Sequence, residues 1–218
     1  MILLSAALLA AAQPALAFPL PQRQVAPVVS PSWDSEERRD RANEAKQVMR
    51  ITGIKPGHVV ADIGAGTGYY TVRVAPVVGP TGKVIAQDIV PRYLTGLRAR
   101  VRRAGIKNVD FVLGSPSDPK LPSSGVDVAL LIHMYHEIAQ PYALLYRLRS
   151  AMKPDGRVAI VDLERSAEFH GMPKGLLVCE VEAVGFTLVS VTDIQPGYLA
   201  VFKPAPAKDP RSVKACRA

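Results

Sequence analysis

The sequence is poor in cysteine, with only Cys179 and Cys216 among 218 residues. The two form no C-x-x-C pair, and the chain lacks the cysteine–histidine spacings that predict a zinc site. Two cysteines also fall short of the disulfide framework of small secreted domains, so they say little about the cellular compartment. No internal repeat, the mark of repeat architectures, is visible either.

Long hydrophobic runs are missing as well. The most apolar stretch, "MILLSAALLAAAQPALA" at residues 1–17, is shorter than the roughly 20 apolar residues that a membrane helix needs. Its ending, Ala15-Leu16-Ala17, matches an A-x-A cleavage site. We therefore expect a signal peptide and an exported or periplasmic protein, with no transmembrane span in the mature chain. No Lys or Arg precedes the apolar core, so the alternatives are a start further upstream, or a retained segment in a membrane-anchored or cytoplasmic protein.

Acidic residues are fewer than basic ones: 19 Asp and Glu stand against 27 Lys and Arg, and the net charge is +8. A basic balance favours anionic partners such as nucleic acids or acidic membranes. The positive charge is spread along the chain, however, and no nucleic-acid-binding motif accompanies it. We expect a small-molecule partner and no nucleic acid. The sequence is silent on the oligomeric state.

Proline-rich segments flank a single domain. Hydrophobic residues make up 48% of the chain, enough for the core of one domain. Residues 18–33 are expected to form a linker, and residues 204–218 a disordered basic tail. A helix is expected from Asp34 to Thr52, because Asp34 and Glu37 form a capping-box pattern. The domain would then span residues 34–203.

Short apolar runs alternate with helical patterns through this domain. Such alternation predicts an α/β fold, a doubly wound sheet covered by helices on both faces. The last two strands are joined only by "QPG", residues 195–197, so they must pair antiparallel, because a parallel crossover needs a dozen or more residues. The predicted strands are 58–63, 83–89, 108–113, 126–132, 156–163, 186–194 and 198–203, and the helices between them are 68–78, 91–105, 140–152 and 174–185.

A glycine-rich loop follows the first predicted strand, within "VVADIGAGTGYY". Glycine permits unusual backbone angles and close approach to a ligand, and the N-terminus of the next helix favours anionic or polar groups. A dinucleotide-binding G-x-G-x-x-G loop would need a third glycine where Tyr69 stands. Asp88 ends the second strand, where a carboxylate can accept hydrogen bonds from a ribose. The alternative role for Asp88 is to cap the helix that begins at Pro91.

The stretch Asp62-Ile63-Gly64-Ala65-Gly66-Thr67-Gly68 resembles motif I of the class I S-adenosylmethionine-dependent methyltransferases. "AMKPDGRVAIVD", residues 151–162, is similar to the stretch before their fifth strand, with Asp155 in place of a glycine. The resemblance covers about residues 36–203. It implies a Rossmann-like seven-stranded sheet in the order 3-2-1-4-5-7-6, mostly parallel with an antiparallel strand seven. It also implies S-adenosylmethionine as cofactor and S-adenosylhomocysteine as product.

The same resemblance implies a set of cofactor-binding residues. Asp62 would orient the loop and the methionine end, and Asp88 would hold the ribose. Ser115 stands where the family often has an acid near the adenine. Asp118 is the substitute acid, although Asp118-Pro119 also fits a plain turn. The full set is Asp62, Gly64, Ala65, Gly66, Gly68, Asp88, Ile89, Ser115, Asp118 and His133.

Polar side chains gather at the carboxyl ends of strands four and five, the edge at which open α/β sheets bind ligands. His136 and Glu137 are the candidate catalytic residues, either being a possible base for the acceptor's proton. The alternative is that His136 caps the next helix and that Glu137 faces its positive end. The substrate is expected beneath the N-terminal helix and the loop 164–175. Its candidate ligands are Tyr135, Asp162 and His170.

A metal reading of this edge is weaker. His133, His136, Glu137 and His170 would have to converge, and no H-E-x-x-H or similar spacing supports that. The site prediction therefore contains no metal.

Two other functions compete with methyl transfer to a small-molecule acceptor. An NAD(P)-dependent oxidoreductase would carry a third glycine at position 69 and a parallel sixth strand. A non-catalytic protein that binds a nucleoside, S-adenosylmethionine or S-adenosylhomocysteine fits the loop equally well, and export favours it because S-adenosylmethionine is made in the cytoplasm. The acceptor atom is not readable. "HMYH", residues 133–136, stands where DNA adenine methyltransferases carry an N/D-P-P-Y motif, which argues against such a substrate.

Overall fold

The computed structural model describes residues 18–28 and 35–217. The expected signal peptide at 1–17 and the expected cap at Asp34 lie outside these residues. Within them, no helix has the length and apolar character needed to cross a membrane.

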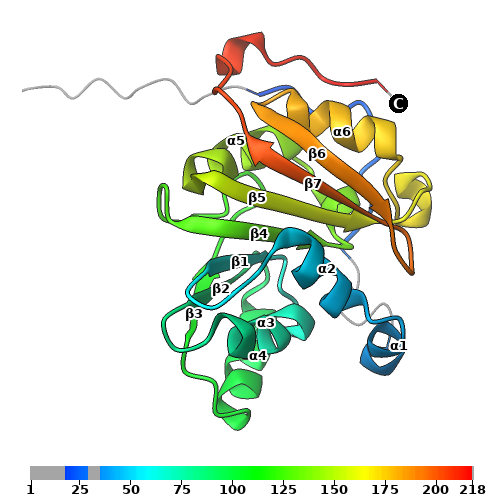
Figure 1. Cartoon of the computed structure of the whole chain (residues 1–218). Coiled ribbons are helices and arrows are strands. Elements are labelled where there is room, and N and C mark those ends of the chain that lie inside the picture. Colours follow the sequence, from blue (N-terminus) through cyan, green and yellow to red (C-terminus); the bar gives the residue numbers. More distant parts are fainter. Residues whose placement is uncertain (1–17, 29–34, 218) are drawn as a thin grey trace, which may run out of the picture.

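A seven-stranded sheet forms the centre of the molecule, in the order β3-β2-β1-β4-β5-β7-β6 (Figure 1). The strand order and the α/β fold are as predicted. Adjacent strands are in register, Ala61 of β1 lying beside Ile85 of β2 and Ala129 of β4. The strands are β1 (Val59–Ile63), β2 (Lys83–Asp88), β3 (Val109–Leu113), β4 (Val126–Ile132), β5 (Met152–Asp162), β6 (Phe186–Asp193) and β7 (Tyr198–Pro204).

Strand β7 runs antiparallel to both of its neighbours, β5 and β6. The three-residue connection 195–197 requires this, because it can only reverse the chain. Strand β5 differs from the prediction at its start. It begins at Met152, directly after the preceding helix, where Met152 pairs with Val126 of β4. The sequence had predicted this strand only from residue 156.

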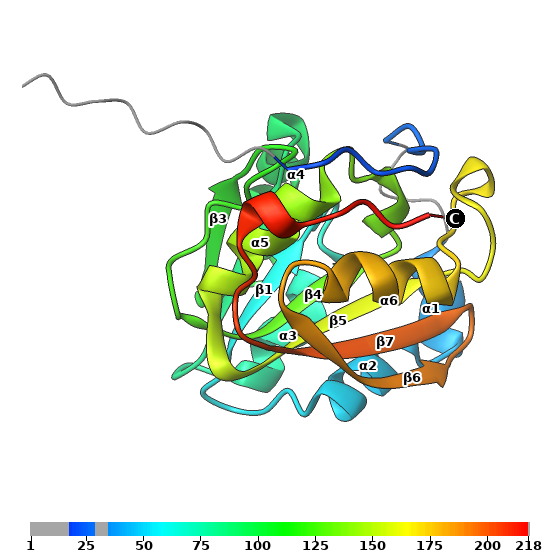
Figure 2. The same cartoon turned by 90° about the horizontal axis from the view of Figure 1, so that it is seen from above.

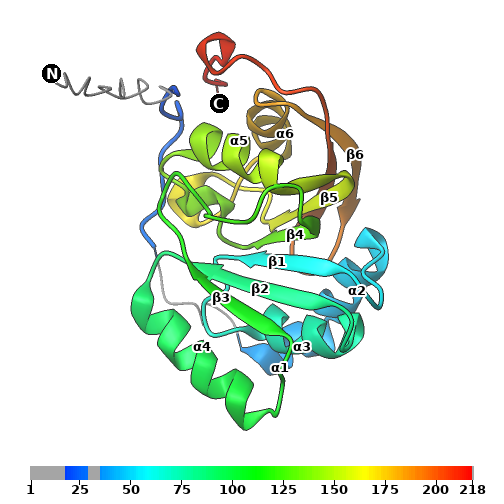
Figure 3. The same cartoon turned by 90° about the vertical axis from the view of Figure 1, so that its left-hand side faces the viewer.

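Helices cover both faces of the sheet, since side chains alternate between the faces along each strand. On one face α2 and α3 pack against Val60, Val84 and Leu130, and α4 packs against Ala86. On the other face α5 and α6 pack against Ile63 and neighbouring apolar residues (Figure 3). The bounds are α3 (Tyr69–Val78), α4 (Pro91–Arg103), α5 (Pro141–Ala151) and α6 (Lys174–Glu182). Both faces of the sheet are therefore covered by helices and shielded from solvent, as the apolar strands predicted.

The predicted N-terminal helix is two helices, α1 (Glu36–Arg41) and α2 (Glu44–Thr52). The break falls at Asn43, which has a left-handed φ of 53°, a conformation that asparagine tolerates better than most residues. Ser35 caps α1 by accepting a hydrogen bond from the Arg38 N–H at 3.2 Å. In this arrangement Glu36 of α1 pairs with Arg73 of α3 and with Arg100 of α4.

Residues 18–28 and 205–217 pack on the domain, where the sequence predicted a linker and a disordered tail; residues 29–33 of that linker lie outside the described residues. Arg23 forms a buried ion pair with Glu180 of α6 at 3.1 Å, and the Ala26 N–H donates to the His136 carbonyl. The tail after β7 crosses α5 and α6 (Figure 2) and buries Val213. A Cys179–Cys216 disulfide joins it to α6. These contacts join residues far apart in the sequence, whereas the prolines and charges of the two segments indicated only that they have no helical or strand periodicity.

Candidate functional site

Three glycines shape the loop between β1 and α3, each with a positive φ: 68° at Gly64, 55° at Gly66 and 86° at Gly68. A Cβ at Gly64 would lie 3.0 Å from the Met134 side chain, and a Cβ at Gly68 would overlap Leu97 of α4. Gly68 thus permits α3 and α4 to pack closely, while Gly64 leaves room above the sheet edge.

The Asp88 carboxylate holds this loop against the end of β2. One oxygen accepts the Gly66 N–H at 2.9 Å, and the other accepts the Val90 N–H at 2.9 Å. The side chain is buried, yet Asp88 lines the cavity described next. Each carboxylate oxygen keeps a second lone pair for a ligand hydroxyl. Both predicted roles, helix entry and ligand binding, are therefore compatible.

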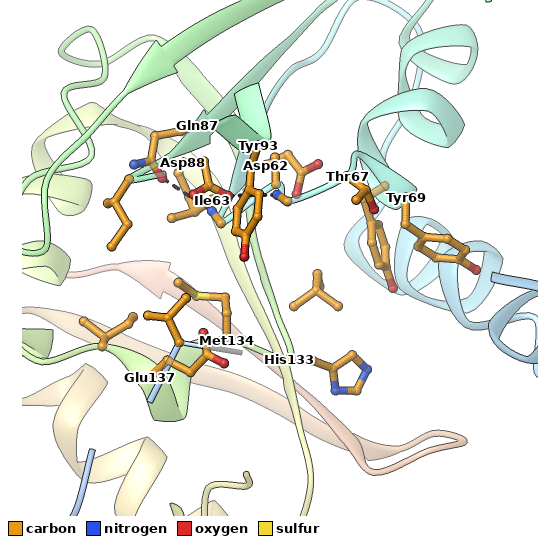
Figure 4. Close-up of a pocket in the computed structure, with 18 of the residues that line it drawn as sticks. Asp62, Ile63, Thr67, Tyr69, Gln87, Asp88, Tyr93, His133, Met134 and Glu137 are labelled. Carbon is orange, nitrogen blue, oxygen red and sulfur yellow. Dashed lines mark hydrogen bonds between the residues drawn. The ribbon is translucent and has the colours of Figure 1, made fainter. Parts of the chain in front are cut away.

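A cavity of about 260 Å³ opens where the loop, the end of β2 and the end of β4 meet (Figure 4). Its apolar walls and few polar groups are typical of a small-molecule site. Most of the predicted cofactor residues line it, and Glu137 of the predicted catalytic pair does so too. The predicted residues in its wall are Asp62, Gly64, Ala65, Gly66, Asp88, Ile89, Ser115, His133 and Glu137.

Asp62 is a buried acid in the wall. Burial raises the pKa of its carboxyl to about 6, against the lowering effect of its hydrogen bond from the Thr71 hydroxyl at 2.6 Å. Arg39 lowers this pKa further and the nearby Asp88 raises it. A cationic ligand group beside Asp62 would favour the charged carboxylate, so this residue suits a positively charged ligand.

The N-terminal helices close the cavity through a network that the sequence did not predict. Arg39 of α1 stacks on the Tyr69 ring at 3.7 Å and donates to Glu44 of α2 at 2.7 Å. Glu44 also contacts Tyr70 at 2.9 Å and His133 at 3.2 Å. Burial alone would raise the Glu44 pKa, but the hydrogen bonds from His133 and Arg39 lower it to about 2. The charged Glu44 therefore ties the helix pair to the end of β4.

Three more residues of the wall were missed. Tyr93 of α4 and Met134 reach into the cavity from opposite sides (Figure 4). Gln87 precedes Asp88 in β2, and its side-chain oxygen accepts the Gly64 N–H at 3.4 Å. Its buried amide nitrogen has no hydrogen-bond partner among the described residues and packs against Gly114, away from the cavity. The sequence could have indicated Gln87 as a wall residue, because it directly precedes Asp88. No sequence feature pointed to Tyr93 or Met134.

Several predicted residues lie outside the wall. Gly68 caps α3, and Asp118 accepts the Lys120 N–H at 2.8 Å in a turn, as the alternative reading had it. The Tyr135 hydroxyl is buried and donates to Glu180 at 2.9 Å. No residue of the fully described loop 164–175 is among those lining the cavity. The expected position of the substrate beneath that loop is thus not found in this cavity.

His136, Asp162 and His170 lie beside the cavity wall, next to Glu137. His136 Nδ1 is 3.0 Å from both oxygens of the fully buried Asp162. The His170 ring meets the His136 ring edge to face, with centroids 5.5 Å apart. The sequence prediction that these residues share one edge of the sheet agrees with this arrangement. The structure nevertheless separates the two candidate catalytic residues, because Glu137 lines the cavity and His136 does not.

The wall fits S-adenosylmethionine by two observations. The glycine loop leaves space that side chains would fill, and each oxygen of Asp88 keeps a lone pair for a ligand hydroxyl. Asp62 supplies the acid that a cationic methionine end requires. The antiparallel β7 departs from dinucleotide-binding folds.

Comparison with known proteins places the domain. Residues 54–184 match a family model described as a methyltransferase domain. The chain is similar to the ubiquinone/menaquinone biosynthesis C-methyltransferase UbiE of Ectopseudomonas mendocina, with 30% identity over 54% of this chain and 46% of that protein. It is similar to the arsenite methyltransferase of Halobacterium salinarum, with 32% identity over 55% of this chain and 30% of that protein. The chain thus spans half or less of the length of these curated relatives.

Solved structures show the same fold. A SAM-dependent methyltransferase from Aquifex aeolicus superposes with a TM-score of 0.69 and 22% identity, covering 78% of this chain and 98% of that one. A [4+2]-cyclase, SpnF, superposes with a TM-score of 0.64 and 16% identity, covering 79% and 68%. One fold therefore carries more than one reaction, and the site residues must carry the argument for function.

Proposed function

Because this chain belongs to the family of class I S-adenosylmethionine-dependent methyltransferase domains, we propose that it transfers a methyl group from S-adenosylmethionine to a small-molecule acceptor. The observation that carries the proposal is the Asp88 carboxylate, which binds the Gly66 N–H and lines the cavity at the same time. In this arrangement the loop and the ribose-binding acid form one unit. S-adenosylhomocysteine is the product that follows.

The residues of the wall divide the cofactor between them. Asp62 and the loop from Gly64 to Gly66 hold the charged methionine end, and Asp88 accepts hydrogen bonds from the ribose hydroxyls. Ile89 and Ser115 flank the adenine. Arg39 and Glu44 keep the helix pair closed over the cavity, which excludes water from the reacting groups.

The bound cofactor supplies an electrophilic methyl group on a sulfonium. The protein's part is to align the acceptor and to remove its proton where there is one. Of the predicted catalytic pair, Glu137 lines the cavity. We therefore assign to Glu137 the role of binding the acceptor's polar group and accepting its proton. His136 is buried behind it and held by Asp162, which gives it no direct access to an acceptor in this cavity.

An organic acceptor fits this chain better than arsenite. The names of the two relatives point to quinone biosynthesis and to arsenite, both small-molecule chemistries. Soft metalloids and metals favour thiolate ligands, and both cysteines of this chain are joined in a disulfide. Apolar walls beside the Glu137 carboxylate suit a compact, largely apolar molecule with one ionisable group.

Calorimetric titration of the full-length protein with S-adenosylmethionine, S-adenosylhomocysteine and NAD tests this function. We expect the first two to bind and NAD not to bind. Asp88→Ala should weaken their binding by about 10–100-fold, since hydrogen bonds to a charged group are worth about 1.5–3 kcal/mol. Asp110→Ala, which removes an exposed acid of the neighbouring β3, is the matched control and should leave binding unchanged. Selective binding of NAD, or equal effects of both variants, would contradict the proposal.

The disulfide also bears on localisation. Disulfides form and persist in oxidising compartments and are rare in a reducing cytoplasm. The Cys179–Cys216 bond therefore supports the proposal that the protein is exported, in agreement with the apolar segment at residues 1–17. Alkylation of free thiols in the native source before lysis tests it: the two cysteines should resist the reagent, and ready labelling would favour a cytoplasmic protein.

A further inference from the structure

Three metal-ligating side chains converge beside the cavity, although no sequence spacing predicted it. His136 and Glu137 belong to the short helix η1 (Tyr135–Glu137), and His170 follows the short helix η2 (Ala167–Phe169). One ligand atom from each of the three lies within 4.8 Å of the others. The residues come from the ends of β4 and β5, which the sheet places side by side.

Asp162 prepares His136 for ligation. Since His136 Nδ1 is hydrogen-bonded to both Asp162 oxygens at 3.0 Å, it carries the proton, and Nε2 is left with a free lone pair. Only 3% of the His136 side chain is exposed and none of Asp162 is, so the ring has little freedom to turn. A carboxylate behind a histidine in this way is the arrangement that fixes and strengthens histidine ligands in metal sites.

His170 is an independent indication. Its buried Nδ1 has no hydrogen-bond partner in the part of the chain that the structure describes. The residue adopts a left-handed φ of 54°, and Arg165 donates to its carbonyl oxygen at 3.4 Å. A buried ring nitrogen without a partner is costly, and binding an ion removes that cost.

We propose that His136, Glu137 and His170 bind one divalent transition-metal ion, with Asp162 as a positioning residue. Two imidazoles and one carboxylate are a zinc-type donor set that leaves a fourth position open. Ligand atoms around tetrahedral zinc lie about 3.3 Å apart, so these side chains must close by up to about 1.5 Å, within reach of small rotations.

The ion would lie at the edge of the cavity, because Glu137 belongs to both the wall and the cluster. Here the inference rests on the proposed function: the open position would take an oxygen or nitrogen of the acceptor. With the ion bound, Glu137 is a ligand and no longer accepts a proton. The ion would lower the pKa of a bound hydroxyl, so that the hydroxyl loses its proton to solvent water before the methyl group is transferred.

The test is a titration of the full-length, untagged, EDTA-treated protein with Zn²⁺, without S-adenosylmethionine. We expect one Zn²⁺ per chain and no comparable binding of Mg²⁺. His170→Ala and Glu137→Gln should each weaken Zn²⁺ binding at least about 10-fold, and Asp162→Asn about 10–100-fold. His58→Ala is the matched control, since His58 precedes β1 at the opposite edge of the sheet, and it should bind Zn²⁺ as the wild type does.

Co²⁺ gives a second readout that a loss of folding cannot imitate. The wild-type protein should show the intense visible absorption of a four-coordinate Co²⁺ site. The His170→Ala variant should lack this absorption, although its unfolding temperature without metal equals that of the wild type. Absence of stoichiometric Zn²⁺ binding, or binding that survives both His170→Ala and Glu137→Gln, overturns the proposal. The Zn²⁺ titration contains no S-adenosylmethionine, so its outcome does not depend on cofactor binding. A protein that binds Zn²⁺ but not S-adenosylmethionine would refute the methyltransferase function and leave the metal site standing.

Discussion

At the scale of single residues, burial governs how Asp62 titrates. Its carboxyl accepts the Thr71 hydroxyl at 2.6 Å, which lowers its pKa, but burial has the larger effect and raises the pKa to about 6. The motif predicted an acid at position 62, whereas only the surrounding atoms set its pKa.

The raised pKa of Asp62 predicts a dependence of stability on pH. The folded protein binds this proton up to about pH 6, whereas an unfolded chain releases it near the usual aspartate pKa of 3.8. Stability should thus fall as the pH rises from about 4 to above 6, by about 3 kcal/mol from this group. In urea unfolding across this range, Asp62→Asn should lack the fall. Curves that stay parallel for the wild type and Asp62→Asn would contradict the assignment, and Asp110→Asn is the exposed control.

At the scale of elements, the glycine loop joins three pieces of secondary structure. Gly68 lets α3 begin directly against α4, and Asp88 fastens the loop to β2. The loop motif predicted the ligand role of these glycines. The motif did not predict the packing role of Gly68. That role depends on Leu97 of α4, which occupies the space that a side chain at position 68 would need.

Gly68→Ala should destabilise the protein by about 2–4 kcal/mol, from left-handed strain together with overpacking. Gly53→Ala is the control, because Gly53 has a similar φ of 69° and no atom within 4 Å of an added Cβ. It should cost about 1–2 kcal/mol, from the strain alone. Both are measured by urea unfolding.

A double-mutant cycle tests the cause of that difference. Leu97→Ala removes the atoms that an alanine at position 68 would overlap, so the double variant should be more stable than the sum of the two single losses predicts. Strict additivity would show that the clash is not what makes position 68 intolerant.

At the scale of the whole molecule, the two flanking segments clasp α6 from both ends of the chain. Arg23 reaches Glu180 and Cys216 reaches Cys179, so neighbouring residues of one helix hold the first and last described segments. Val28 of the N-terminal segment also lines the cavity. The first and last described segments are therefore both fastened to α6, and the first of them also reaches the cavity.

Removing the disulfide should cost about 4 kcal/mol, the loop-closure entropy for its sequence separation of 37 residues. Either single substitution, Cys179→Ala or Cys216→Ala, breaks the same bond. Each should therefore lose about as much stability as the double variant in urea unfolding. Dithiothreitol should destabilise the wild type and leave the double variant unaffected. Additive losses would show that the cysteines act through packing and not through the bond.

The sequence by itself determined the features that neighbouring residues encode. Apolar periodicity located the strands to within a few residues, and the three-residue connection at 195–197 required an antiparallel β7. The spacing of Asp62, the loop glycines and Asp88 indicated the cofactor edge, because these residues lie on consecutive elements whose geometry the βαβ unit dictates.

Only the tertiary structure decided which distant residues meet. The Arg23–Glu180 pair, the Cys179–Cys216 bond and the network around Glu44 each join segments with no local pattern in common. The convergence of His136, Glu137 and His170 arose in the same way. Periodicity reports how a segment is built, whereas contacts between segments depend on how the sheet and its helices bring their ends together.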